Sequence, residues 1–337
     1  MCGKEGGKMK VLVLSPKARY ETYGAGTALP AGVELVFCDR SGTEEEWLAA
    51  GADAEVLFAT PITWIKEAFI AQMPRLKMIH CEGVGVDRID LAAARRRGIY
   101  VCNNAGCNAP AVAELSIMLM TMLLRRILWG DRMVRSGRQN EAVRAMEAAT
   151  PGDLSSSVVG LVGFGAIAQA TAERLRPYGC KVYYYSRHRK NPETERHFAV
   201  EYLPLETLAE RCDVISLHLP ATAERRHLLG PEFFSRVKPS AYLVNTARGA
   251  VIDDEALCGA IRSGRLAGAA LDAYDPEPVA GDHPLVLLAR EFPDRLVLSP
   301  HQGGVARSAF RRAHEMLFED LEKLLAGQRP GHIVNGL

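Results

Sequence analysis

The stretch "VVGLVGFGAIAQA" (residues 158–170) joins a short apolar run, two closely spaced glycines and the start of a helical pattern. Gly163 and Gly165 lie between that run and a helix beginning near Ala166, and Ala168 takes the last position of a G-x-G-x-x-A motif. The first glycine permits a tight turn, the second lets the backbone approach a pyrophosphate, and a small third residue keeps helix and strand close. A lone motif of this kind also arises by chance as a plain glycine turn. The strand–turn–helix context favours a dinucleotide-binding site, because a helix N-terminus offers unpaired N–H groups to phosphates.

On both sides of this stretch, short β-branched runs alternate with longer helical patterns. The runs are "KVLVL", "VELVF", "AEVLFA", "LKMIHC" and "IYVC" in the first third, then "VVGLVGF", "KVYYYS", "DVISLHL", "AYLVNT", "LAGAALDA" and "RLVLSP". Runs separated by helices predict parallel sheets covered on both faces. Two successive sets, in a chain of 337 residues, predict an α/β protein with two doubly wound domains.

Two helical segments bear on how the domains connect. The segment from Pro110 to about Arg138 has apolar residues at helical spacing, and we expect one long helix there, between the two sets of strands. After His301 the chain is helical again, and this last helix could return to the first domain, which would make that domain discontinuous.

Composition excludes several functional classes. Forty-one Lys and Arg residues against 40 Asp and Glu leave no global field for nucleic acid or an anionic membrane. The longest apolar window, residues 113–124, contains Glu114 and is too short to span a bilayer. The eight cysteines include no C-x-x-C pair and the start lacks a signal-peptide pattern, so we expect no metal site and a cytoplasmic location.

The segment "KVYYYSRHRK" (residues 181–190) bears on which dinucleotide binds. NAD-binding folds usually place Asp or Glu about 20 residues after the glycine loop, on the ribose hydroxyls. This chain has Ser186 there, followed by Arg187 and further basic residues. A hydroxyl and a guanidinium would hold a 2′-phosphate, which a carboxylate would repel. We therefore favour NADP over NAD, although a solvated basic turn has the same appearance.

Three charged residues each follow a strand-like run of the second set: Arg248, Glu277 and His301. The carboxyl ends of parallel strands line one crevice, so all three side chains can face a bound nicotinamide. A guanidinium binds a carboxylate and a carbonyl oxygen, and a histidine donates a proton to that oxygen as hydride reaches carbon. A carboxylate beside the histidine favours the imidazolium form. Together these residues predict hydride transfer to a 2-oxo acid.

Several motifs, in this order and spacing, resemble the D-isomer-specific 2-hydroxyacid dehydrogenase family. They are "GVGVDRIDLAAARRRGI", "AVAEL", "LVGFGAIA", "LHLPAT", "LVNTARGAVID", "LAGAALDAYDPEP" and "LSPHQGG". The resemblance covers nearly the whole chain. It implies an enzyme that uses NAD(P)H to reduce a small 2-oxo acid to a D-2-hydroxy acid.

The resemblance also implies roles for individual residues. Arg248 would bind substrate, Glu277 would orient and charge His301, and His301 would be the acid/base. Val84 and Gly85, in the "GVG" loop, would donate backbone N–H groups to the substrate carboxylate. Cofactor contacts are implied for Gly163, Gly165, Ala166, Ile167, Ser186, Arg187, His218, Pro220, Thr222, Thr246, Arg248, Asp272, His301 and Gly303.

At the level of domains, the resemblance implies a flavodoxin-like substrate domain (residues 1–104 and 302–337) and a Rossmann dinucleotide domain (residues 105–301). It also implies a homodimer built through the dinucleotide domain. The basic turn looks most like the NADP-preferring glyoxylate and hydroxypyruvate reductases. A non-catalytic NAD(H)-sensing regulator of the same fold stays open, as does a phosphoglycerate- or phosphite-type dehydrogenase.

Overall fold

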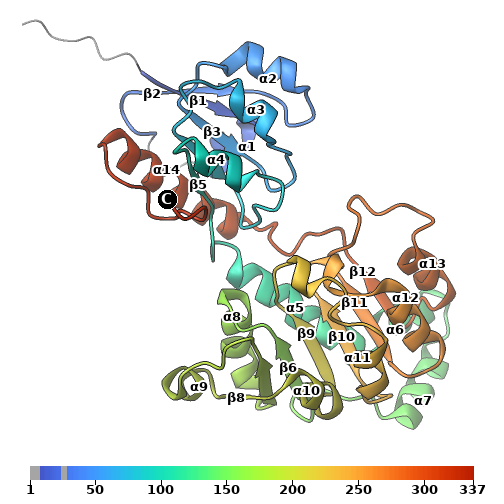
Figure 1. Cartoon of the computed structure of the whole chain (residues 1–337). Helices are drawn as coiled ribbons and strands as arrows, with labels where there is room; N and C mark the ends of the chain where they lie inside the picture. Colours follow the sequence, from blue (N-terminus) through green and yellow to red (C-terminus); the bar gives the residue numbers. More distant parts are fainter. Residues whose placement is uncertain (1–7, 24–28) are drawn as a thin grey trace, which may run out of the picture. The chain divides into compact units, whose positions relative to one another are not determined.

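The computed structural model describes residues 8–23 and 29–337, which fall into two compact units (Figure 1). Unit 1 comprises Met1–Asn108 and Val305–Leu337, and unit 2 comprises Ala109–Gly304. The last helix of the chain, α14 (Arg307–Leu325), therefore belongs to the same unit as the first strand. No helix in residues 8–23 and 29–337 combines the length and the apolarity that crossing a membrane requires.

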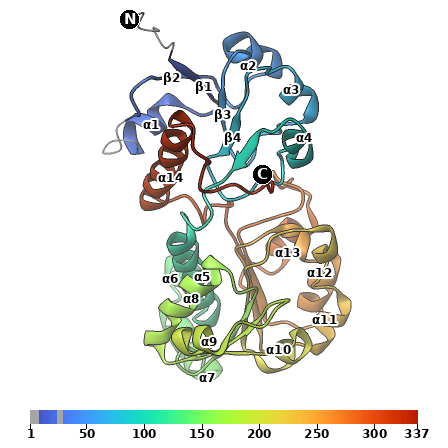
Figure 2. The ribbon, with the colours of Figure 1, turned by 60° about the vertical axis from the view of Figure 1, so that its left-hand side comes forward.

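Unit 1 is built on a five-stranded parallel sheet in the order β2-β1-β3-β4-β5, the order of flavodoxin-like folds. Its strands are β1 (Met9–Val13), β2 (Val33–Phe37), β3 (Val56–Ala59), β4 (Met78–Cys81) and β5 (Tyr100–Cys102). Its other helices are α1 (Lys17–Tyr23), α2 (Glu44–Gly51), α3 (Glu67–Ala71) and α4 (Leu91–Arg96). One core packs α2, α3 and α4 on one face of the sheet, and another packs α1 and α14 on the other (Figure 2).

The start of α2 shows how local sequence sets an element boundary. The hydroxyl of Thr43 accepts a hydrogen bond from the N–H of Glu46, and the Glu46 carboxylate accepts one from the N–H of Thr43. This reciprocal capping box satisfies two N–H groups that a helix start leaves unpaired. The helix can therefore begin directly after the loop, and Trp47 on its buried face anchors it to the core.

Unit 2 is built on a seven-stranded parallel sheet in the order β12-β11-β10-β9-β6-β7-β8. Its strands are β6 (Val158–Val162), β7 (Lys181–Tyr185), β8 (Val200–Tyr202), β9 (Val214–Leu217), β10 (Tyr242–Asn245), β11 (Gly268–Leu271) and β12 (Leu296–Leu298). Its helices are α5 (Ala109–Leu124), α6 (Ile127–Arg135), α7 (Gln139–Ala149), α8 (Ala166–Leu175), α9 (Pro192–Phe198), α10 (Leu205–Arg211), α11 (Pro231–Arg236), α12 (Asp254–Arg262) and α13 (Pro284–Glu291). Helices α5 and α8 cover one face and α10 to α13 the other, which is the doubly wound arrangement expected from the sequence.

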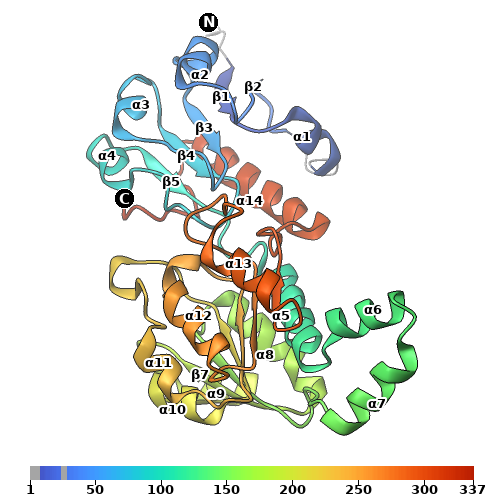
Figure 3. The same ribbon diagram turned by 90° about the vertical axis from the view of Figure 1, so that its right-hand side faces the viewer.

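The expectation of one long helix from Pro110 to about Arg138 is wrong. Helix α5 ends at Leu124, and a second helix, α6, starts at Ile127. Between them Arg126 adopts φ 49° and ψ 42°, in the left-handed region, and its guanidinium lies 4.8 Å above the ring of Trp129. The chain turns there, so that α6 and α7 extend away from the rest of unit 2 (Figure 3). No proline or glycine stands between the two helices, so the sequence gives no signal of this break.

Candidate active site

The turn from β6 to α8 contains both glycines of the motif. Gly163 has φ 99°, and a Cβ there would lie 2.6 Å from the carbonyl oxygen of His218, so a side chain is excluded on two counts. Gly165 occupies the N-cap position of α8, and no described atom lies within 4 Å of a Cβ built there. Ala168 is fully buried where α8 packs on the sheet. The turn thus leaves space in front of a helix N-terminus, which is where phosphate oxygens bind.

The other residues predicted to contact the cofactor follow neighbouring strands. Ala166 and Ile167 begin α8; His218, Pro220 and Thr222 follow β9; and Thr246 follows β10. Strands β6, β9 and β10 are adjacent in the sheet, so these residues lie along its carboxyl edge. The Nε2 atom of His218 lies 3.0 Å from the hydroxyl of Ser216, and burial lowers the pKa of His218 to about 3. His218 is therefore a neutral hydrogen-bonding group.

In the basic turn after β7, two arginines pair with different glutamates. Arg189 forms two hydrogen bonds of 2.8 Å with the carboxylate of Glu195. Arg187 lies 3.7 Å from Glu224, and both of these side chains are largely exposed. The hydroxyl of Ser186 donates to the carbonyl of His188 (2.6 Å). Because an exposed ion pair contributes little free energy, Arg187 can exchange its partner far more readily than Arg189.

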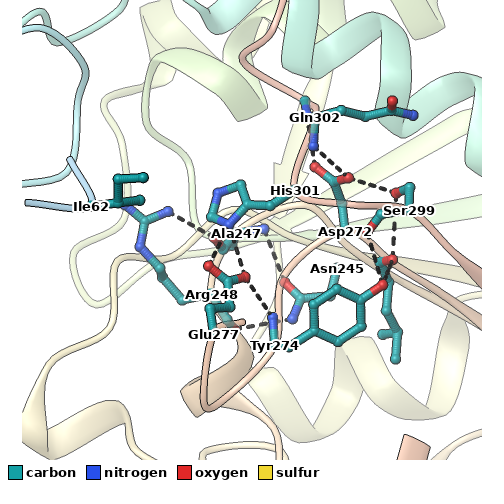
Figure 4. Close-up of polar contacts among 12 residues, drawn as sticks. Ile62, Asn245, Ala247, Arg248, Asp272, Tyr274, Glu277, Ser299, His301 and Gln302 are labelled. Atoms are coloured by element: carbon teal, nitrogen blue, oxygen red, sulfur yellow. Dashed lines mark hydrogen bonds and ion pairs between the residues drawn. The ribbon is translucent and has the colours of Figure 1, made fainter. Parts of the chain in front are cut away.

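His301 and Glu277 form a close titratable pair at this edge of the sheet (Figure 4). The Nδ1 atom of His301 lies 2.8 Å from each carboxylate oxygen of Glu277, and the N–H of Tyr274 donates to Oε1 of the same carboxylate (2.9 Å). Burial alone would raise the pKa of Glu277. Hydrogen bonds from His301 and Tyr274, with the charges of His301 and Arg248, outweigh burial and lower that pKa below its usual range. The pair therefore holds an ionised carboxylate against one ring nitrogen.

The loop that carries His301 is held by a buried carboxylate. Asp272 is 1% exposed and accepts hydrogen bonds from the hydroxyl of Ser299 (2.6 Å) and from the N–H groups of Gln302 (2.9 Å) and Gly303 (2.8 Å). These contacts lie on both sides of His301, whose own φ is 52°. A left-handed conformation is unfavourable for histidine and persists only where neighbouring contacts determine it. Asp272 supplies those contacts.

Arg248 is delivered by a turn that begins at the end of β10. The side chain of Asn245 accepts from the N–H of Ala247 (2.9 Å) and donates to the carbonyl of Arg248 (3.0 Å). A Cβ on Gly249 would lie 2.1 Å from the carbonyl carbon of Tyr274, so only glycine allows this close approach. The guanidinium of Arg248 also helps lower the pKa of Glu277, which places it within electrostatic reach of the pair (Figure 4).

Sequence reasoning identified the charged residues but missed the residues that support them. Asn245 could have been found, because an asparagine at a strand exit commonly caps the following turn. Tyr274 has no such signal. Its hydroxyl lies 2.8 Å from the carbonyl of Ser299 and its N–H contacts Glu277, so it links the strands that carry the two members of the pair. Asp272 was expected only as a cofactor contact.

In unit 1, the loop Gly83–Gly85 has all three of its carbonyls occupied. The carbonyl of Gly83 accepts from the N–H of Asn104 (2.9 Å), that of Val84 from the side-chain amide of Asn103 (2.7 Å), and that of Gly85 from the thiol of Cys81 (3.1 Å). Among the described residues, no hydrogen-bond partner occurs for the N–H groups of Val84 and Gly85. A loop with its carbonyls tied back and its N–H groups available can bind an anion.

Comparisons with known proteins identify the family and the fold of this chain. Residues 117–303 match the family model described as D-isomer specific 2-hydroxyacid dehydrogenase, NAD binding domain. The glyoxylate reductase of Thermofilum pendens is 36% identical over 293 residues, which cover 87% of this chain and 85% of that protein. Apo D-mandelate dehydrogenase of Rhodotorula graminis aligns with a TM-score of 0.83 at 26% identity, over 97% of this chain and 98% of that one. For D-lactate dehydrogenase of Aquifex aeolicus, complexed with NAD and lactic acid, the TM-score is 0.81, the identity 25% and the coverage 97% and 99%.

Proposed function

Because this chain belongs to the D-isomer-specific 2-hydroxyacid dehydrogenase family, we propose that it reduces glyoxylate and hydroxypyruvate to 2-hydroxy acids. The chain is an NAD(P)-dependent oxidoreductase of 2-oxo acids. Relatives named glyoxylate reductase are 33–37% identical to this chain, and they favour glyoxylate as its substrate. The observation that carries the proposal is the contact of both Glu277 oxygens with Nδ1 of His301.

We assign the proton transfer to His301. Its Nδ1 is held by Glu277, and among the described residues none forms a hydrogen bond with Nε2, so this nitrogen is available to the substrate oxygen. When the substrate carbonyl is reduced, Nε2 donates its proton and the ionised Glu277 stabilises the imidazolium before transfer. NAD(P)H, when bound, supplies the hydride. Arg248 orients the substrate through its carboxylate and carbonyl oxygens.

The N–H groups of Val84 and Gly85 are proposed to bind the substrate carboxylate. The tied-back carbonyls described above support this role, because they keep the oxygen atoms of the loop away from an anion. Unit 1 would then be the substrate domain and unit 2 the dinucleotide domain. The open space at Gly165 and the N-terminus of α8 fit a pyrophosphate there.

NADP is the proposed cofactor in preference to NAD. Ser186 and Arg187 stand where an acid would reject the 2′-phosphate, and Glu224 holds Arg187 only through an exposed pair. Arg187→Ala should reduce kcat/KM for NADPH by about tenfold or more and leave kcat/KM for NADH within about twofold. Arg189→Ala is the matched control, since Arg189 is committed to Glu195 and should not affect the discrimination. A wild-type enzyme that is faster with NADH would contradict the assignment.

A substrate panel tests the proposed reaction. NADPH and NADH oxidation should be followed with glyoxylate, hydroxypyruvate, pyruvate and bulkier 2-oxo acids such as phenylglyoxylate. We expect the highest kcat/KM for glyoxylate or hydroxypyruvate. Preference for phenylglyoxylate would instead align the chain with its D-mandelate dehydrogenase neighbour. Absence of turnover with every 2-oxo acid would favour a dinucleotide-sensing regulator. Turnover of phosphoglycerate or phosphite would favour a dehydrogenase of the phosphoglycerate or phosphite type.

The homodimer and the cytoplasmic location stay predictions. Light scattering during size-exclusion chromatography measures the first directly, and a mass equal to one chain would refute it. The second requires localisation of the protein in its own cells.

A further inference from the structure

We propose that Glu82 is a positioning residue for the anion-binding loop Gly83–Gly85. Its carboxylate is held in a buried cluster with Ser15, Arg19 and Tyr20. The inference rests on the proposed role of this loop in binding the substrate carboxylate. Glu82 directly precedes the loop in sequence and does not itself contact the substrate in this proposal.

The side chain of Glu82 is buried and is held by hydrogen bonds and an ion pair. The residue is 3% exposed, and its Oε1 accepts a hydrogen bond of 2.9 Å from the hydroxyl of Ser15, just beyond β1. The hydroxyl of Tyr20 donates to the same oxygen. Arg19 supplies the compensating charge, with its Nη1 atom 3.3 Å from Oε2 of Glu82. A carboxylate buried without such partners would be strongly unfavourable, so these ties determine its position.

The partners of Glu82 are themselves held by packing. The ring of Tyr20 lies edge-on to His314 (centroids 4.6 Å apart) and to Phe37 (5.3 Å). Burial and the adjacent Glu82 raise the pKa of Tyr20 well above its ordinary value, so its hydroxyl keeps the proton that it donates. The guanidinium of Arg19 lies 4.2 Å from the centroid of Phe310. Through these contacts Glu82 is linked to α1 and to α14, on one face of the sheet.

The position of Glu82 is transmitted to the loop through the backbone. Its N–H donates to the carbonyl of Ala59 at the end of β3 (2.8 Å), and its own carbonyl carbon begins the peptide link to Gly83. The carbonyls of Gly83 and Val84 are held from the other side by Asn104 and Asn103. Glu82 therefore holds the loop to β3 and α1, and the other contacts of the loop come from Cys81 on β4 and from the segment after β5.

An electrostatic effect of Glu82 would act in the opposite direction. A negative charge behind an anion-binding loop repels the substrate carboxylate, so removal of the charge alone would strengthen substrate binding. Loss of positioning would weaken it. The sign of the change in KM for the 2-oxo acid therefore separates the two effects.

Three variants test the proposal by steady-state kinetics with glyoxylate and NADPH. Glu82→Ala removes every tie and should raise KM for glyoxylate about tenfold, with kcat at saturation and the Kd for NADPH within about twofold. Glu82→Gln keeps an oxygen for Ser15 and Tyr20, and should restore KM to within about threefold of wild type. Tyr20→Phe keeps the ring packing, loses one tie, and should give an intermediate KM.

Glu55→Ala is the matched control. Glu55 is also a buried glutamate of this sheet, paired with Arg75 (2.6 Å) and Lys77 (2.7 Å), but it precedes β3 and so lies at the opposite, amino end of the strands. Its loss should lower the melting temperature without changing KM. If Glu55→Ala raised KM as much as Glu82→Ala, the effect would be general destabilisation and the proposal would be wrong.

A second measurement does not depend on turnover. Hydrogen–deuterium exchange of peptides covering residues 83–86 should be faster in Glu82→Ala than in wild type, and unchanged in Glu55→Ala. Unchanged exchange in Glu82→Ala, or a KM that falls in Glu82→Gln, overturns the positioning role. A wild-type enzyme inactive on all 2-oxo acids would instead refute the proposed function, and the exchange result would still decide whether Glu82 fixes the loop.

Discussion

At the scale of single residues, His301 is held at one nitrogen of its ring and in a backbone conformation that histidine rarely adopts. Both oxygens of Glu277 lie 2.8 Å from Nδ1, and Asp272 binds the two N–H groups that follow His301 in the chain. Two carboxylates therefore set the ring and its loop independently. In the proposed mechanism, Glu277 would support the proton transfer of His301, and Asp272 would hold the loop that carries it.

His301→Ala removes the proposed proton donor without disturbing the loop. We expect kcat for glyoxylate reduction to fall by about a thousandfold or more, because general acid catalysis typically contributes factors of that order. The Kd for NADPH, measured by fluorescence titration, should change by no more than about twofold.

Gln302→Ala is the control for this substitution. Gln302 contacts Asp272 through its backbone N–H, which alanine retains, so turnover should stay close to wild type. Full activity in His301→Ala would exclude His301 as the acid.

At the scale of elements, the two glycines of the β6–α8 turn are needed for different reasons. Gly163 is required by the fold: its φ is 99° and His218 crowds it. Gly165 has φ −90° and ψ −167°, which any residue can adopt, and open space around it. A glycine at the second position is consistent with the close approach of a pyrophosphate, which the motif predicts.

Alanine substitutions at the two glycines should therefore behave differently. Gly163→Ala should lower the free energy of unfolding by about 2 kcal/mol or more, since left-handed strain and a backbone clash add. Gly165→Ala should leave that free energy within about 0.5 kcal/mol but weaken NADPH binding by about tenfold or more, since its methyl group takes the place of the pyrophosphate. Urea denaturation and NADPH titration of both variants provide the two quantities. Unchanged NADPH affinity in Gly165→Ala would contradict the placement of the cofactor.

At the scale of the whole molecule, unit 1 is assembled from the two ends of the chain, and Asp320 on α14 helps join them. This fully buried carboxylate lies 3.1 Å from Nε2 of His80 on β4, 3.0 Å from Nδ1 of His332, and accepts the N–H of Gly331 (2.6 Å). Burial alone would raise the pKa of Asp320. Hydrogen bonds from His80, Gly331 and His332 outweigh burial and lower the pKa to about 2.

This shift predicts a dependence of stability on pH. Because the folded-state pKa is lower than the unfolded one of about 3.9, Asp320 stabilises the fold above about pH 4, and that stabilisation is lost as pH falls towards 2. The difference in unfolding free energy between wild type and Asp320→Asn should decrease by about 2 kcal/mol between pH 5 and 2. Urea denaturation across that range measures the difference. A constant difference would show that the ionised carboxylate does not contribute in this way.

Local features of this protein could be predicted from its amino-acid order. Of the twelve strands in the described residues, the apolar runs identified eleven. The run for β8 was not detected, because three residues contain too little pattern to stand out. The glycine motif and the order of the later motifs located the carboxyl edge of the second sheet. They also indicated Arg248, Glu277 and His301, since residues that follow parallel strands must share an edge.

Most of the groups that support those residues could not be predicted in this way, because they meet them through packing of the folded chain. Asp272 binds the N–H of Gln302 in the loop of His301, and Glu82 is buried against Ser15, so both contacts join segments distant in sequence. A hydrogen bond between such segments leaves no periodic or local trace, because it depends on how elements pack and not on the order of neighbouring residues. Local motifs therefore indicate the candidate reactive residues, whereas tertiary packing determines where these residues are held.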